Sequence, residues 1–173
     1  MDSPGFVTRI GLALAAPRWA LLVADDPRTP GRPGSDVIRL FALVLVCVHT
    51  RALVAAAWLG AVVDVRIGLR VATSTLSRAF SAPLAFLVVA SLAVWLLGGS
   101  RRSLGRAFDL ACVALVPIIV VDVIATLVIR AGGWSLPPIL RIVVLGAGFS
   151  WSGVLVALAL VQMRRSRRGG GKV

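Results

Sequence analysis

The stretch "WLLGGSRRSLGRAFDLACVALVP", residues 95–117, places a Gly-Gly pair and three arginines between two apolar runs. Such a segment is either a loop of a soluble protein or the aqueous turn between two membrane helices. Hydrophobic residues make up 58% of the 173 residues and the mean hydropathy is +0.95, whereas soluble domains are roughly 45–50% apolar. The chain is therefore predicted to be an integral membrane protein, and the stretch to be an aqueous hairpin.

Four apolar runs predict an all-α membrane bundle of about four transmembrane helices within residues 36–163. A span needs roughly 20 apolar residues, and lipid leaves backbone N–H and C=O groups without partners unless the segment is helical. The predicted spans lie near residues 37–63, 82–98, 107–129 and 139–163. The second is short and must borrow flanking residues. Residues 66–80, which precede it, are either a second surface helix or a loop on the headgroups.

The N-terminal residues 1–35 are predicted to hold an interfacial helix followed by a Pro/Gly-rich linker. The segment "FVTRIGLALAAPRWALLVADDP", residues 6–27, could also be a signal peptide. Its uninterrupted apolar core, Ile10–Ala16, is short for that, and Pro17 and Arg18 then interrupt the apolar run. An interfacial helix would place Trp19 at headgroup depth and its arginines against lipid phosphates. The linker "DDPRTPGRPGSD", residues 25–36, contains three prolines and two glycines, which predict a non-helical segment.

The basic residues, 19 against 7 acidic ones, predict the orientation. With four spans and both termini inside, 13 basic residues lie on the inner side, 5 on the outer side and Arg51 in the membrane, which favours cytoplasmic termini. The basic tail, residues 164–173, is expected to bind anionic lipid headgroups rather than nucleic acid. Arginine almost to the exclusion of lysine indicates a GC-rich bacterial genome, and hence a bacterial inner membrane. The tail arginines expected to act as anchors are Arg164, Arg165, Arg167 and Arg168.

Two charged residues in different spans are predicted to form an intramembrane ion pair. Helices 1 and 3 run in the same direction in this topology. At about 1.5 Å per residue from the inner-side Arg39 and Arg106, Arg51 lies roughly 18 Å deep and Asp122 roughly 24 Å deep. An unpaired charge at such depth is costly. The alternative is that Arg51 faces a partner subunit or a lipid phosphate, with Asp122 meeting water on the outer side.

Two further polar residues lie within the predicted spans. His49 is about 200° around the helix from Arg51, and is expected to be packed or hydrogen-bonded rather than a proton relay. Asp109 is expected near the inner headgroups, where Arg102 or Arg106 can neutralise it.

Small residues recur at helical spacing in two spans. They fall on one face of the fourth span at Gly146, Ser150, Gly153 and Ala157, and on one face of the first at Ala52, Ala56 and Gly60. Small residues at such steps let membrane helices approach closely, although alanine is abundant in this chain. The stripe in the fourth span, which combines glycine and serine, is the stronger prediction of a packing face.

Catalytic, cofactor and metal sites are not indicated. The chain has one histidine, one lysine and no tyrosine, and its two cysteines, Cys47 and Cys112, stand alone in separate apolar runs without zinc spacing. The segment "GAGFSWSG" lacks the strand-to-helix setting of a nucleophile elbow, and no Gly-Lys-Ser/Thr sequence indicates a phosphate loop. The protein is therefore predicted not to be an enzyme, and no cofactor is expected.

The segments "AAPRWALLVADDP", residues 15–27, and "LLGGSRRSLGRAFDLACVALVP", residues 96–117, resemble the Yip1-domain family of small multispan membrane proteins. The likeness lies in a Pro-aromatic stretch ending in Asp-Pro before the first span, and in a Gly-Gly hairpin before a helix with an internal proline. Eukaryotic members bind prenylated small GTPases in vesicle traffic. Their acidic, tyrosine-containing motif is absent here, so the resemblance implies a membrane fold, usually of five spans, and not the GTPase role.

Two classes of function are compatible with these features. The first is a non-enzymatic scaffold or accessory subunit that packs against other membrane proteins, with lipid contacts, no nucleic acid, and a homo-oligomer as one form. The second is a small transporter or proton- or ion-coupled component using Arg51, His49, Asp109 and Asp122. No inverted repeat is visible and four short helices leave little room for a transport path, so the first class is favoured. Purification alone or within a larger assembly would discriminate between them.

Overall fold

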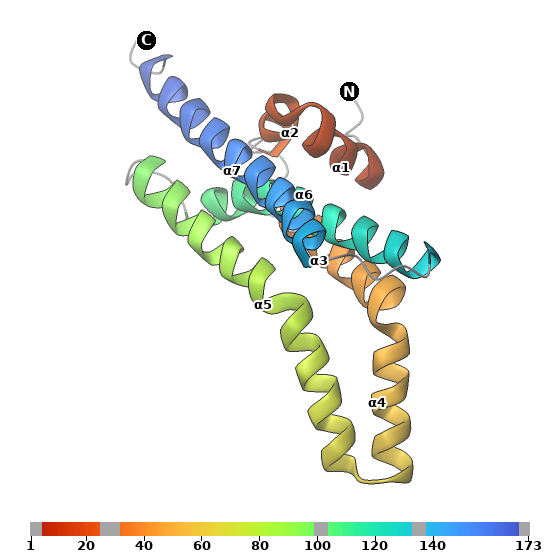
Figure 1. Ribbon diagram of the computed structural model, residues 1–173. Helices are drawn as coiled ribbons and strands as arrows, with labels where there is room; N and C mark the ends of the chain where they lie inside the picture. The colour runs from red at the N-terminus through yellow and green to blue at the C-terminus, as the bar shows by residue number, and fades with distance from the viewer. Residues whose placement is uncertain (1–4, 25–31, 99–103, 133–137, 170–173) are drawn as a thin grey trace.

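The computed structural model describes residues 5–24, 32–98, 104–132 and 138–169, and these residues form helices without any β-strand (Figure 1). Four helical segments are long and apolar enough to cross a membrane: Arg32–Val62, Val65–Gly98, Leu104–Gly132 and Ile142–Val161. The predicted all-α helical membrane fold with four spans is therefore confirmed. The elements are α1 (Phe6–Ala15), α2 (Pro17–Ala24), α3 (Arg32–Val44), the π-helical η1 (Leu45–His49), α4 (Thr50–Val62), α5 (Val65–Gly98), α6 (Leu104–Gly132) and α7 (Pro138–Gly169).

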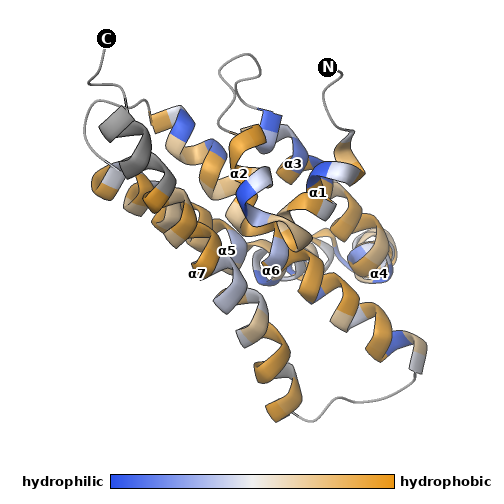
Figure 2. Cartoon of the chain, turned by 90° about the horizontal axis from the view of Figure 1, so that it is seen from above, coloured by the Kyte–Doolittle hydropathy of each residue, from blue (hydrophilic) through white to orange (hydrophobic). Residues whose placement is uncertain are grey.

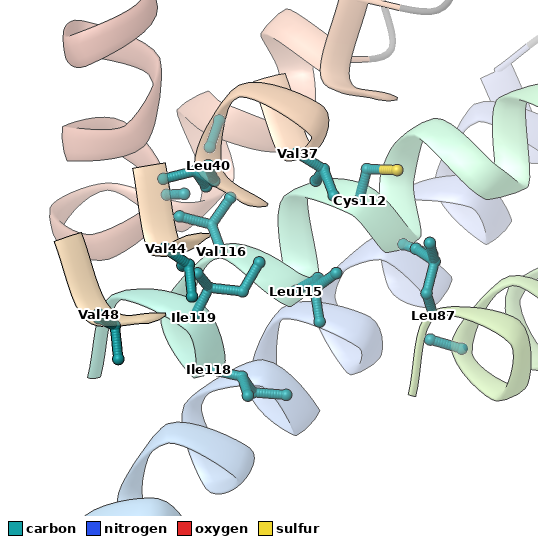
Figure 3. Close-up of a cluster of buried hydrophobic side chains, with 14 residues drawn as sticks. Val37, Leu40, Val44, Val48, Leu87, Cys112, Leu115, Val116, Ile118 and Ile119 are labelled. Carbon is teal, nitrogen blue, oxygen red and sulfur yellow. The ribbon is translucent and has the colours of Figure 1, made fainter. Parts of the chain in front are cut away.

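The first half of α6 forms the centre of the molecule. In its most apolar stretch 44% of the residues are buried, against 22% in each of the other three spans. Its side chains pack with those of α3, η1 and α5, as the close-up shows (Figure 3). The core residues labelled there are Val37, Leu40, Val44, Val48, Leu87, Cys112, Leu115, Val116, Ile118 and Ile119. Because this core involves only parts of the spans, the remaining helix surfaces are left exposed.

Three of the spans contain a helix irregularity near the core. The first has the π-helical turn η1, while α5 contains Pro83 and α6 contains Pro117. A π turn or an internal proline interrupts the regular i to i−4 hydrogen bonding and bends a helix. Beyond these points, α4 with the first half of α5, and the second half of α6 with the start of α7, extend from the core as two hairpins (Figures 1 and 2).

The second span begins much earlier than predicted. Residues 66–80 are neither a separate surface helix nor a loop, because α5 is continuous from Val65 and the connection to α4 is only Val63–Asp64. The carboxylate of Asp64 accepts a hydrogen bond of 2.7 Å from the backbone N–H of Arg66. This side chain satisfies one of the free N–H groups at the start of the helix. The arginines and hydroxyl residues of this segment therefore lie on a helix surface.

The N-terminal region forms two short helices, α1 and α2, that are separated at Ala16 and pack on the bundle. The prediction that residues 25–36 are non-helical is wrong for Arg32–Asp36, which form the start of α3. Pro33 lies in the first turn of α3. Backbone N–H groups in the first turn have no acceptor within the helix, so a proline without an N–H is tolerated there. The rest of that segment lies outside the described residues.

Candidate functional site

A buried ion pair fastens the N-terminal helices to the first span. Arg9 of α1 donates two hydrogen bonds to Asp36 of α3, from Nε to Oδ2 and from Nη2 to Oδ1, each 2.6 Å long. The side chains are only 13% and 9% exposed. The pKa of Arg9 is raised, chiefly by its hydrogen bonds to Asp36 and against the desolvation that lowers it. Arg9 is thus held as a cation, and it faces Asp36 rather than the lipid phosphates predicted for it.

Other contacts strengthen this attachment. The Arg39 guanidinium lies 5.8 Å from the centroid of the Phe6 ring, within the range of cation–π attraction. The indole Nε1 of Trp151 on α7 donates to the carbonyl oxygen of Ala13 at 3.4 Å. Ala13 and Leu21 are themselves buried. The N-terminal helices are therefore an integral part of the core, while Trp19 remains exposed as an interfacial residue would be.

A cavity of about 40 Å³ lies beside the ion pair, between the N-terminal helices, α3 and α6. Arg9, Arg32, Asp36 and Cys112 contribute polar atoms or the thiol to its wall. Its volume corresponds to a few water molecules at most, and it offers no room for a substrate. This region is consequently a structural joint between α1 and α3.

Close backbone packing joins α4 to α5, as the small-residue stripe of the first span predicts. Ala56 is buried, and Ala52 and Gly60 are half-buried. A Cβ placed on Gly68 of α5 would lie 2.6 Å from the Ala56 carbonyl oxygen and 2.6 Å from the Gly60 Cα. The helices approach so closely here that only a glycine fits at position 68. Sequence reasoning missed Gly68 because the residues around it were not assigned to a span.

The small-residue stripe predicted as a packing face lies on the outer face of α7, where it makes no packing contact within the described chain. This outer face consists of four exposed residues, Gly146, Ser150, Gly153 and Ala157. A Cβ added to either glycine would meet no atom within 4 Å. The inner face, which does pack against the bundle, consists of Gly148, Ser152, Leu155 and Ala159. Its spacing is identical but shifted by two residues, which is about 200° around the helix.

The inner face of α7 makes the close contacts of this helix with α6. A Cβ on Gly148 would lie 3.4 Å from the Val121 Cβ and 3.5 Å from the Ile118 Cα. The side chains of Ser152 and Leu155 are fully buried. Helix α7 therefore has small residues on two opposite faces, of which the bundle uses one.

The predicted pair of Arg51 and Asp122 is not formed within the described chain. Arg51 is exposed on α4 and Asp122 is half-buried on α6, and no ion pair joins them. The depth estimate treated helices 1 and 3 as straight and adjacent. The π turn η1 instead directs α4 away from the core, where it packs against α5 (Figure 1).

The remaining predicted residues lie in different settings. His49 is half-buried at the end of η1, and its role as a packed or hydrogen-bonded residue stays a prediction. Asp109 is buried in the second turn of α6, and Arg106, its predicted neutralising partner, lies one turn earlier. Helix α7 continues to Gly169, so the tail begins as helix, while the side chains of the tail arginines lie outside the described part of the structure. Cys47 and Cys112 are both free thiols.

The fold and the exposed α7 face define a small multispan helical membrane protein. Comparisons with protein families, with curated proteins and with solved structures find no match to this chain. In the described residues no group of three or more potential metal ligands gathers at one place. The outer face of α7, which makes no close contact within the described chain, is the candidate functional surface.

Proposed function

We propose that this protein is a non-enzymatic scaffold or accessory subunit that docks to another membrane protein through the outer face of α7. The supporting observation is that this stripe of four small residues is exposed along its whole length, while the opposite face of the same helix makes the contacts within the chain. Van der Waals packing between small residues is a principal force that holds membrane helices together. An exposed stripe of this kind therefore suits a partner helix.

By helical geometry, the small residues of the outer face lie between larger side chains, which leaves a shallow groove along the helix. Large exposed side chains stand beside it on the same helix, with Ile142 and Phe149 on one side and Val143 and Val154 on the other. A helix with ridges of large residues can interdigitate with such a groove. Ser150, within the groove, makes no hydrogen bond with any described residue, and its hydroxyl is available to a polar group on a partner.

We further propose that the protein resides in a bacterial inner membrane with both termini cytoplasmic. The first turn of α1, the end of α5 and the end of α7 lie toward one end of the molecule, opposite the α4–α5 turn (Figure 1). The basic tail then faces the anionic inner leaflet, where each arginine contributes about 1 kcal/mol of attraction.

Affinity purification from native membranes in mild detergent tests the docking role. The wild-type protein is expected in a complex larger than one chain. Ala157→Leu fills the groove and should abolish the complex, because a bulky side chain keeps the partner backbone away. Ala147→Leu is the matched control, since Ala147 is also exposed on α7 but lies about 100° from Gly146. A complex that survives Ala157→Leu, or a wild-type protein recovered only as single chains, would contradict the proposal.

A further inference from the structure

A second cavity, of about 200 Å³, lies between the second half of α6 and the first half of α7. It is lined by Asp122, Ala125, Thr126, Ile129 and Arg130 of α6 and by Val144 and Leu145 of α7. This space is smaller than the roughly 300–1,000 Å³ of pockets for drug-sized ligands. It can hold a small molecule of several heavy atoms, in a part of the protein that the docking face of α7 does not use.

Three polar side chains follow one ridge of α6 along this cavity. Asp122, Thr126 and Arg130 are four residues apart, so each lies about 6 Å along the helix from the next. Asp122 is half-buried and makes no ion pair or hydrogen bond with any described residue. An unpaired carboxylate within a membrane span is costly and marks a functional site by default. A cation on a ligand would supply the missing partner.

The cavity combines opposite charges at its two ends. Asp122 lies deeper, and Arg130, exposed in the last turn of α6, lies nearer the end of the helix. Arg130 lines the same cavity as Asp122, and long side chains on a helix generally lean toward its N-terminus, which is the direction in which Asp122 lies. The wall between the charges is apolar except for the Thr126 hydroxyl. A lone cation would be repelled by Arg130, and a lone anion by Asp122.

We propose that this cavity binds a small free zwitterion, with its ammonium group on Asp122 and its anionic group on Arg130. The Thr126 hydroxyl accepts a hydrogen bond from the ammonium group, and the aliphatic wall contacts the carbons between the two charges. A zwitterionic phospholipid fits less well. Its ammonium group lies on the water side of its phosphate, whereas in this cavity the carboxylate is the deeper group.

A series of ω-amino acids tests the proposal on the purified full-length protein. Binding of glycine, 4-aminobutyrate and 6-aminohexanoate is measured by isothermal titration calorimetry in detergent and compared with that of n-hexylamine and hexanoate. The longer amino acids should bind, and glycine and the singly charged compounds should bind at least about tenfold more weakly, because each leaves one protein charge unpaired. If n-hexylamine bound as tightly as 6-aminohexanoate, the proposal that the ligand is a zwitterion would be contradicted. It would also be contradicted if none of the amino acids bound.

Two variants test which protein charge binds which end of the ligand: Asp122→Asn, which is isosteric, and Arg130→Gln, which is shorter. Asp122→Asn should weaken 6-aminohexanoate binding by about thirtyfold or more, and Arg130→Gln by about three- to tenfold, because a group at the rim contributes less than a half-buried one. Asp64→Asn and Arg70→Gln, on the exposed hairpin of α4 and α5, are the controls and should bind normally. If Asp122→Asn does not fold, the comparison of ligands on the wild-type protein still tests the proposal, because that comparison needs no variant. Stabilisation by phosphatidylethanolamine vesicles, without an effect of the free amino acids, would assign the site to lipid and overturn the proposal.

Discussion

The crossing of α4 and α5 offers the sharpest test of the fold, because it contains two glycines with opposite surroundings. An alanine Cβ at position 68 would lie 2.6 Å from the Ala56 carbonyl oxygen, 2.6 Å from the Gly60 Cα and 2.7 Å from the Gly60 nitrogen. A Cβ at position 60 would lie 3.5 Å from the Gly68 Cα and 3.9 Å from the Val65 Cα. Only the second set of distances is ordinary van der Waals contact.

The expected magnitude follows from these contacts. In Gly68→Ala the helices must separate by about 1 Å, since all three close atoms belong to the backbone of α4 and cannot rotate away. Overpacking of this kind costs about 1–3 kcal/mol. Replacing glycine by alanine within a helix stabilises the helix by about 1 kcal/mol because of the higher helix propensity of alanine. This stabilisation is common to both variants. We therefore expect Gly60→Ala to be neutral or stabilising, and Gly68→Ala to be less stable than Gly60→Ala by about 1–3 kcal/mol.

The free energy of unfolding of each variant can be measured by titrating the detergent-solubilised protein with SDS and following tryptophan fluorescence. Hydrogen exchange of the α4 amides gives a local measurement for the same hairpin. Faster exchange is expected in Gly68→Ala and not in Gly60→Ala. Equal stabilities and equal exchange rates for the two variants would refute the close crossing of these helices.

Three further outcomes are expected. Ser152→Ala should raise the free energy of unfolding by about 1 kcal/mol, because the buried Ser152 hydroxyl has no hydrogen-bond partner among the described residues. Ser91→Ala should lower the free energy of unfolding by a similar amount, because it removes a buried hydrogen bond of 2.6 Å to the Leu87 carbonyl oxygen. If both serine variants lose stability, the inner packing of α7 is wrong. Arg9→Gln and Asp36→Asn should each destabilise the protein by about 3 kcal/mol and speed hydrogen exchange in α1, because each leaves a buried charge unpaired. The double variant should recover much of the lost stability, and additive losses would argue against the ion pair. In detergent, a maleimide should modify the exposed Cys47 quickly and the buried Cys112 only after unfolding, and equal rates at the two thiols would place α6 outside the core.

The helical class and the number of spans were accessible from the sequence because hydropathy is a local property. Each apolar run must be helical in lipid wherever it packs. The extent of α5 was less accessible, since the polar residues 66–80 interrupt the apolar run without interrupting the helix. Hydropathy indicates whether a segment lies in lipid or in water, but it does not show where a helix begins. The signal in the sequence for the beginning of α5 was Asp64, whose side chain caps the helix.

The choice of packing face on α7 could not be made from spacing. Gly146, Ser150, Gly153 and Ala157 recur at the same steps as Gly148, Ser152, Leu155 and Ala159, and only the position of α6 decides between them. The failed pairing of Arg51 with Asp122 has a related cause. The π turn at residues 45–49 contains neither glycine nor proline, so nothing in its composition announces the change of helix direction.

The Arg9–Asp36 pair was missed because its two members are far apart along the chain and each has a plausible local role. Arginine beside an apolar helix is typical of lipid contacts, and Asp36 is the last residue of a Pro/Gly-rich segment that was predicted to be a linker. The available signal was an acidic residue at the beginning of a span, where burial requires a cation as its partner.

Photocrosslinking in intact membranes tests the docking role of α7 most directly. A photoreactive amino acid is introduced singly at each position from 146 to 157, and adducts of higher mass are quantified after irradiation of living cells. We predict that adducts to another membrane protein peak at positions 146, 150, 153 and 157 and are weak at position 147. Adducts spread evenly over the exposed positions, or absent from those four, would contradict docking through the outer face of α7.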